Sequence, residues 1–166
     1  MRLTTKGRYA VTAMLDLAFH SQIKPVTLTD IAGRQTISLS YLEQLFSRLR
    51  RANMVKGIRG PGGGYMLADK AQNINIADII AAVDEPLDAT KCGGEANCQN
   101  EKACLTHDLW MGLSEQIRDY LKGITLAQLL EKHQVQQIAK RQEQDAQQVI
   151  ELRRHTELMS NLNDLL

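Results

Sequence analysis

The sequence lacks any long apolar segment, because its longest wholly apolar run is the stretch 79–83. A membrane-spanning helix needs about 20 such residues, so we expect no transmembrane helix. The polar start at residues 1–6 also has none of the apolar character that a secretory signal requires. These absences predict a cytoplasmic protein that makes no membrane contact.

Recognisable catalytic arrangements are missing as well. No Ser/His/Asp set and no pair of carboxylates stands in a context typical of a hydrolase. The glycine-rich stretch 60–64 lacks the Gly-Lys-Ser/Thr ending of a phosphate-binding loop and does not precede a predicted helix. The sequence therefore predicts a protein that is not an enzyme.

What is present is an ordinary globular composition with an uneven charge. The chain has 166 residues, of which 43% are hydrophobic and 23% are charged, which suits one domain with an elaborated second half. The net charge is +1, but residues 1–66 hold ten Lys or Arg against three Asp or Glu, a net +7, which leaves −6 for the rest. A basic first half indicates a polyanionic partner such as DNA.

Helical periodicity dominates the first half. Apolar residues recur at three-to-four spacing over residues 7–20, and Thr27 can cap a short second helix. The stretch 38–40 opens a third helix, in which Ser40 and Glu43 have capping-box spacing. A short helix, a tight turn and a longer helix are typical of a helix-turn-helix.

Two β-prone segments follow, at 54–58 and 65–68, on either side of the glycine-rich stretch. They predict a hairpin, and a hairpin directly after a helix-turn-helix is the wing of a winged-helix domain. A short helix at 76–83, capped by Asn75, completes a predicted DNA-binding domain at 1–83. The predicted fold class is mostly α: a winged helix-turn-helix domain with a two-stranded wing, then a cysteine-bearing loop and a long dimerisation helix.

The outward face of the third predicted helix carries side chains suited to DNA. Five polar residues are expected to face solvent there: Ser40, Tyr41, Gln44, Arg48 and Arg51. Gln pairs with adenine, Ser and Tyr bond to bases or phosphates, and Arg neutralises phosphates. Arg59 at the hairpin tip is placed to enter a minor groove. The alternative is a solvated face without a ligand, but the turn, the hairpin and the positive charge together favour DNA.

All three cysteines fall within thirteen residues, at Cys92, Cys98 and Cys104, and His107 follows three positions after the last. Such an odd cluster indicates metal or redox chemistry rather than a set of disulfides. Three thiolates and an imidazole complete the ligand set of a zinc ion or of a 2Fe-2S cluster. Their spacing favours neither, and it leaves redox thiols without metal as a third possibility.

The second half is predicted in three parts. A linker and the cysteine loop occupy 84–107, and the loop has almost nothing apolar, so we expect metal binding to order it. A dimerisation helix and a short helix occupy 108–133, because the apolar stripe from Leu109 to Leu121 has little local surface to cover it. The Gln-rich stretch 134–166 is weakly periodic and predicts a frayed or exposed helical tail.

Several of these motifs together resemble the IscR family of bacterial iron-sulfur cluster regulators. The resemblance rests on Thr-Lys-Gly-Arg-Tyr-Ala at 5–10, Ser-Leu-Ser-Tyr-Leu-Glu-Gln-Leu-Phe at 38–46, Arg-Gly-Pro-Gly-Gly-Gly-Tyr at 59–65 and the cysteine-histidine segment. It runs from residue 1 to about residue 130. It implies a homodimeric winged-helix transcription factor that senses iron-sulfur supply and regulates cluster-assembly genes, mainly as a repressor.

The resemblance also implies roles for particular residues. A 2Fe-2S cluster, delivered by the cluster-assembly machinery, would be held by Cys92, Cys98, Cys104 and His107. Contacts to pseudo-palindromic double-stranded DNA would come from Ser40, Tyr41, Gln44 and Arg59, and Glu43 resembles the residue that makes site choice depend on the cluster. A protein of another class, a redox or cluster carrier whose basic half binds an acidic partner, stays open, as does a regulator with a structural zinc.

Overall fold

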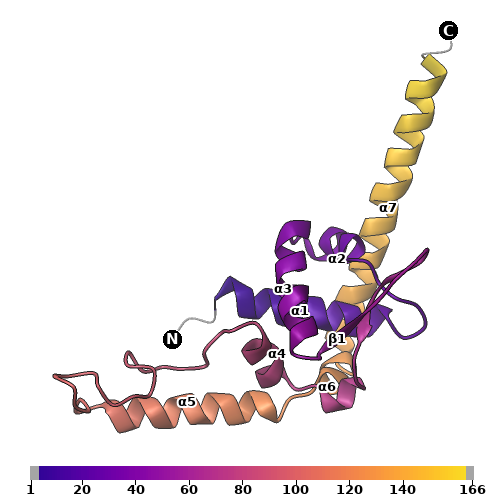
Figure 1. Ribbon diagram of the computed structural model, residues 1–166. Helices are drawn as coiled ribbons and strands as arrows, with labels where there is room; N and C mark the ends of the chain where they lie inside the picture. Colours follow the sequence, from indigo (N-terminus) through magenta and orange to yellow (C-terminus); the bar gives the residue numbers. More distant parts are fainter. Residues whose placement is uncertain (1–3, 164–166) are drawn as a thin grey trace.

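The computed structural model describes residues 4–163 of the chain. Its helices and strands are α1 (Thr5–His20), α2 (Leu28–Gln35), α3 (Leu39–Arg51), β1 (Val55–Ile58), β2 (Gly64–Leu67), the 3-10 turn η1 (Ala71–Asn73), α4 (Ile76–Ala82), α5 (His107–Lys122), α6 (Leu126–Leu130) and α7 (His133–Asn163). Figure 1 shows the first four helices and the hairpin gathered together, with α5 to one side and α7 extending away. The predicted mostly α fold with a two-stranded wing is confirmed.

Local capping explains where the first helices begin. Thr27 and Asp30 form a capping box at the start of α2, as predicted for Thr27. The predicted capping box of Ser40 and Glu43 is wrong, because α3 begins earlier, with Ser38 as its N-cap. Ser38 has extended backbone, and its carbonyl accepts the first N–H groups of the helix, so Ser40 is already inside the first turn.

The hydrophobic core lies between α1, α2, α3 and α4. The buried stripe of α3 is the predicted one, and the largest wholly buried side chains include Phe46, Met14, Leu17, Ile31 and Leu42. Burial of such a side chain contributes about 1.5–3 kcal/mol. This core fixes α3, the recognition helix, with its opposite face outward.

The wing is an antiparallel hairpin in the register Val55↔Leu67 to Ile58↔Gly64. The backbone of Val26, between α1 and α2, bonds to Tyr65 and adds a short third edge. A side chain at Gly63 would lie 2.4 Å from the Ile58 carbonyl oxygen, and one at Gly64 would lie 2.5 Å from the Val26 carbonyl oxygen. The turn itself therefore requires Gly63, and the close approach of the Val26 backbone requires Gly64, whatever the tip binds.

The apolar stripe of α5 divides into two parts, and only one of them is left uncovered by the rest of the chain. Ile117 and Leu121 pack against the hydrophobic core, because α4 lies next to this end of the helix. Leu109, Leu113 and Tyr120 stay exposed. Figure 1 shows the loop before α5 running alongside its other end.

The prediction of a frayed or exposed helical tail is confirmed in its second form, because the tail is a helix that is exposed over most of its described length. Residues His133–Asn163 form one continuous helix, α7, and its first turns lie against α1 and α2. The weak apolar periodicity hides this packing, because Val135, Ile138 and Ala139 meet α1 only over a short stretch. Beyond it, α7 extends away from the other helices (Figure 1). Within residues 4–163, no helix is both long and apolar enough to cross a membrane.

Candidate metal site and DNA-reading face

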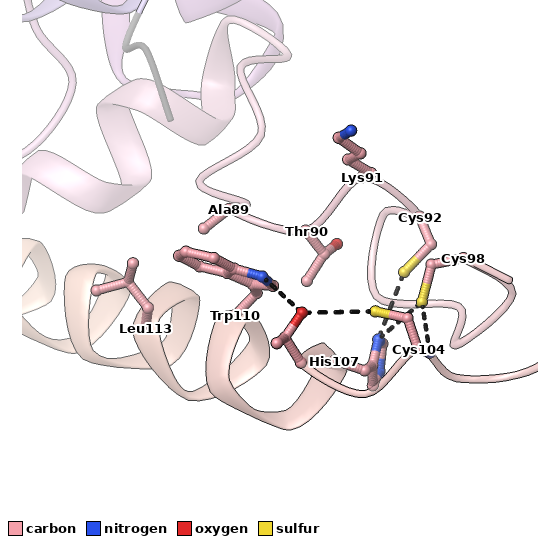
Figure 2. Close-up of a pocket in the computed structure, with 10 residues that line it drawn as sticks. Ala89, Thr90, Lys91, Cys92, Cys98, Cys104, His107, Trp110 and Leu113 are labelled. Atoms are coloured by element: carbon pink, nitrogen blue, oxygen red, sulfur yellow. Dashed lines mark hydrogen bonds between the residues drawn. The ribbon is translucent and has the colours of Figure 1, made fainter.

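Three of the four predicted metal ligands converge at the start of α5. The donor atoms of Cys92, Cys98 and His107 all lie within 4.8 Å of one another. The Nδ1 atom of His107 is 3.6 Å from the Cys92 sulfur and 3.8 Å from the Cys98 sulfur. Figure 2 shows both sulfur atoms facing the imidazole ring, which is buried. Cys92 and His107 are fifteen positions apart in the chain, and the fold brings their donor atoms close to each other and to the Cys98 sulfur.

The fourth predicted ligand, Cys104, lies beside this triplet rather than in it. Its backbone N–H donates to the Cys98 sulfur at 3.0 Å, and its own sulfur lies 3.8 Å from the hydroxyl oxygen of Thr106. It lines the same cavity of about 440 Å³ as the other three ligands. A group bound in that cavity is therefore within reach of all four side chains.

The thiols differ in how readily they ionise. Burial raises the pKa of Cys92, but hydrogen bonds from Thr90 and from the backbone of Gly94 and Ala96 outweigh it and lower the pKa to about 6. A hydrogen bond with Cys98 lowers the pKa of Cys104. For Cys98, the backbone N–H of Cys104 favours the thiolate, yet the neighbouring thiols prevail and raise its pKa. Only the thiolate binds metal, so Cys92 is the ligand best prepared for it.

Two threonines that the sequence analysis did not single out support the thiols. The Thr90 hydroxyl accepts from the Gly94 N–H at 2.9 Å, which shapes the loop around Cys92. The Thr106 hydroxyl accepts from the indole N–H of Trp110 at 3.2 Å. Each threonine stands two residues from a cysteine, a position that the sequence alone does not distinguish from an ordinary polar loop. Such neighbours orient the metal ligands in known sites.

The donor set fits a thiophilic metal ion or an iron-sulfur cluster. Soft thiolates and an imidazole suit zinc and iron-sulfur chemistry, whereas calcium and magnesium prefer oxygen ligands. The loop that carries the cysteines has only sparse internal support, such as the paired backbone bonds between Gln99 and Lys102. A group bound there would add order to this loop, in which none of residues 92–106 is buried.

The second candidate site is the outward face of α3. Ser40, Glu43, Gln44 and Arg51 are exposed there, in agreement with the predicted face. Tyr41 is not free in solvent as predicted: it is half-buried, and its ring meets that of Tyr9 edge-to-face at 5.8 Å. Its phenol therefore sits at the flank of the recognition face.

Arg48 also departs from the prediction that it faces solvent alone. Its guanidinium forms an ion pair with the carboxylate of Asp84, just after α4. The departure has a physical reason, since the end of α4 brings the Asp84 carboxylate to this flank of α3. Arg59 is exposed where the wing leaves β1, as predicted.

A winged helix with an exposed polar recognition face defines a DNA-binding transcriptional regulator. The family model of Rrf2, described as an iron-dependent transcriptional regulator, matches residues 3–132. The chain belongs to this family.

Named relatives agree with that assignment. The chain is 60% identical over 144 residues to the HTH-type transcriptional regulator IscR of Photobacterium profundum, covering 87% of this chain and 84% of the relative. It is 59% identical over 145 residues to the HTH-type transcriptional regulator IscR of Vibrio campbellii, covering 87% and 86%.

Solved structures show the same fold. The IscR of T. potens superposes with a TM-score of 0.66 at 38% identity, covering 79% of this chain and 87% of that one. CymR, the global cysteine regulator of B. subtilis, superposes with a TM-score of 0.67 at 33% identity, covering 78% and 95%. The two neighbours share the winged-helix architecture, so the fold alone does not decide which signal is sensed.

Proposed function

We propose that this chain is a homodimeric regulator that senses iron-sulfur supply through a 2Fe-2S cluster and regulates genes of cluster assembly, mainly by repression. The observation that carries the proposal is the convergence of Cys92, Cys98 and His107 within 4.8 Å in a chain of an iron-dependent regulator family. A DNA-binding regulator acts where the chromosome lies, so a cytoplasmic location belongs to the proposal.

The cluster would be held by Cys92, Cys98, Cys104 and His107. A cluster is wider than a single ion, so its ligands are spread further apart than those of zinc, which is in keeping with Cys104 lying beside the triplet rather than inside it. When bound, the cluster supplies a signal of iron-sulfur supply, and the assembly machinery is its donor. The residues of this chain supply the thiolates, the imidazole and the ordering of the loop.

DNA recognition would fall to α3 and the wing. Ser40 and Gln44 are exposed and suited to base edges, while Arg51 and Arg59 are suited to phosphates and to the minor groove. Tyr41 and Arg48 would contact DNA from the flank of the helix, and Glu43 would make the choice of site depend on the cluster. A pseudo-palindromic double-stranded operator follows from a twofold dimer.

Dimerisation would use the part of α5 that the core leaves exposed. Leu109, Trp110 and Leu113, on the turns that follow the cysteine loop, are 63%, 41% and 41% exposed. Large apolar side chains gathered on one helix are typical of an interface. Placed there, the dimer contact borders the cluster site and divides the chain into a reading part (1–83), a sensing loop (84–107), a dimer part (108–133) and a tail (134–166).

The test is anaerobic purification followed by metal and sulfide analysis. We expect a coloured protein with about two irons and two sulfides per chain, the stoichiometry of a 2Fe-2S cluster. Cys92→Ala and Cys98→Ala should abolish the colour and leave the winged helix folded, while Thr29→Ala, at an exposed position of α2, is a control remote from the site. One tightly held zinc and no sulfide would instead establish a structural zinc and contradict the cluster.

The single tryptophan gives a second measurement. Trp110 lines the same cavity as the cysteines, so a cluster that absorbs visible light should quench its fluorescence. Loss of the cluster should restore the emission, and the Cys92→Ala protein should show unquenched Trp110 fluorescence as purified. Salt-dependent binding of the same preparations to a DNA duplex separates a regulator from a cluster carrier, since a carrier does not bind DNA.

A further inference from the structure

A second cavity, of about 220 Å³, lies between α1 and the first turns of α7, and no part of the proposed function uses it. Its walls are mostly apolar and include Val11, Leu15, Phe19, Val135 and Ile138. A water molecule occupies roughly 30 Å³ of liquid, so the space exceeds that of a single ordered water. An apolar cavity with a few polar groups is the usual form of a small-molecule site.

The polar groups gather at one end, and most of them are satisfied. Asp16 accepts hydrogen bonds from the Arg34 guanidinium at 2.7 and 3.0 Å and from the Gln35 amide at 2.7 Å. The amides of Gln35 and Gln142 bond to each other at 3.0 and 3.3 Å, which ties α7 to the end of α2. These groups have little capacity left for a ligand.

His20 is different, because one of its ring nitrogens has no hydrogen bond. Nδ1 lies 2.9 Å from the backbone oxygen of Asp16, so in the neutral imidazole this nitrogen carries the proton and Nε2 is an acceptor. Within residues 4–163, Nε2 is the buried side-chain polar atom that lacks a hydrogen-bond partner. The carboxylate of Glu143 faces it from 3.9 Å away. Buried polar atoms without partners are rare in folded proteins.

We propose that this cavity binds a small organic molecule with an apolar body and one hydroxyl or protonated amino group. The apolar body fills the space between α1 and α7, and the hydroxyl or ammonium donates to Nε2 of His20. An ammonium also faces the Glu143 carboxylate. An anion is disfavoured, because Glu143 and Asp16 both stand at this end and the Arg34 guanidinium is already paired with Asp16.

The location gives such a ligand a structural consequence. One wall belongs to α7, which begins where the match to the family model ends, and the other belongs mainly to α1 of the DNA-binding domain. A ligand that touches both walls stabilises the packing of α7 on the DNA-binding domain by mass action. The site is independent of the cysteines, so its test does not depend on cluster content.

Benzyl alcohol, benzylamine and toluene are matched probes, because they share a ring and differ in the donor. Calorimetric titration of the full chain in alkaline buffer, where the imidazole of His20 is neutral, should show binding of benzyl alcohol and benzylamine about tenfold tighter than that of toluene, since toluene leaves Nε2 without a partner. Both donors should also raise the melting temperature. His20→Phe should bring the three affinities together, and His133→Phe, on the exposed start of α7, is the matched control.

Two further variants keep the result decisive. Ala139→Phe places a ring in the cavity and should abolish binding of all three probes. The Glu143 side chain is 47% exposed, so Glu143→Gln should leave the protein folded. This change should weaken the binding of benzylamine and leave the binding of benzyl alcohol unchanged. Absence of binding at millimolar concentrations, or binding that Ala139→Phe does not affect, would overturn the proposal.

Discussion

The Oδ2 atom of Asp84, one residue beyond the C-cap of α4, forms an ion pair with Nη1 of Arg48 on the recognition helix. The same residue accepts a hydrogen bond on its backbone oxygen from Lys6 at 3.0 Å. Next to it, the buried Glu85 carboxylate accepts the N–H and the hydroxyl of Thr4, at 2.7 and 2.5 Å. Hydrogen bonds and an ion pair therefore hold the start of the linker, residues 84 and 85, against both α1 and α3.

A second set of hydrogen bonds holds the linker in place close to the cysteines. Asp88 accepts hydrogen bonds from the backbone and hydroxyl of Thr90 at 2.7 and 2.9 Å, and Ser114 of α5 donates to Asp88 at 3.3 Å. Thr90 in turn supports Cys92. Residues 84–92 thus lie between the cysteine loop and the recognition helix and make polar contacts on both sides. Under the proposed function, ordering of the loop would bias the DNA-binding face through these contacts.

Asp84→Asn tests this connection. The change removes the carboxylate that holds Arg48 and frees the guanidinium for phosphate, so we expect tighter DNA binding and a salt dependence steeper by about 0.9 in log-log slope. Folding stability should change little, because an exposed ion pair contributes about 0–1 kcal/mol. Binding titrations at several salt concentrations measure the slope, with the exposed Asp145→Asn as control. An unchanged slope would show that Arg48 does not reach DNA.

Truncation of Gln44 and truncation of Arg51 should impair DNA binding in different ways. Gln44→Ala should reduce discrimination between base pairs by about 1–3 kcal/mol if the amide makes a bidentate contact to a base. Arg51→Ala should weaken binding to all duplexes alike and flatten the salt slope. Competition between an operator and a random duplex separates the two effects. Equal losses on both duplexes for Gln44→Ala would remove its base-reading role.

Glu43 should determine which operators require the cluster. Its carboxylate is exposed on the recognition face, where phosphate repels it and a cytosine amino group can satisfy it. We therefore expect one class of operator that binds with or without cluster and another that binds well only with it. Glu43→Ala should let the Cys92→Ala protein bind the second class. Titrations of both proteins on both operators decide the matter, and identical affinities before and after the change would exclude Glu43 from the mechanism.

Much of the fold follows from the sequence because local signals there are strong. Thr27, Asn75 and Thr125 are caps that bind the backbone three residues on, so the starts of α2, α4 and α6 were predictable from a few letters. The glycine-rich tip and the apolar stripe of α3 likewise indicate a turn and an amphipathic helix from the local sequence alone.

The contacts that need distant partners were not predictable in this way. The pairing of Arg48 with Asp84 spans 36 positions, and that of Gln35 with Gln142 spans 107. No periodicity records such a contact, because one polar side chain on a helix surface resembles another until the tertiary fold brings its partner close. For the same reason the sequence predicts four metal ligands but not that Cys104 stands outside the tight triplet.

The buried Asp16 should make folding stability depend on acid pH. Burial raises the pKa of Asp16, but hydrogen bonds from His20, Arg34 and Gln35 outweigh it, so the folded pKa lies below 3.8. A carboxyl group with a lowered pKa stabilises the fold above its unfolded value, and the contribution is lost as pH falls through the folded pKa. Stability should therefore decline below about pH 4 as Asp16 takes up its proton.

His20 should make folding stability depend on pH above 6.5. Its hydrogen bond with the Asp16 side chain raises its pKa above 6.5, against the opposing effect of burial, so its contribution is complete below pH 6.5 and is lost as pH rises through the folded pKa. Urea unfolding across the pH range should place maximal stability between these two limits.

Asp16→Asn should diminish both contributions, because the raised pKa of His20 depends on its hydrogen bond with the Asp16 side chain. The change should destabilise the fold by up to about 3–5 kcal/mol, since it leaves the Arg34 guanidinium, whose side chain is only 11% exposed, without its carboxylate, and it should flatten the acid limb. His20→Gln should flatten the limb above pH 6.5 and weaken the acid limb in part, because Asp16 loses one hydrogen bond but keeps Arg34 and Gln35. Asp145→Asn, on the exposed part of α7, serves as the matched control. If Asp16→Asn kept the acid limb of the parent protein, the carboxylates responsible would lie elsewhere, and the Asp16–Arg34 pair would not set the acid stability of the fold.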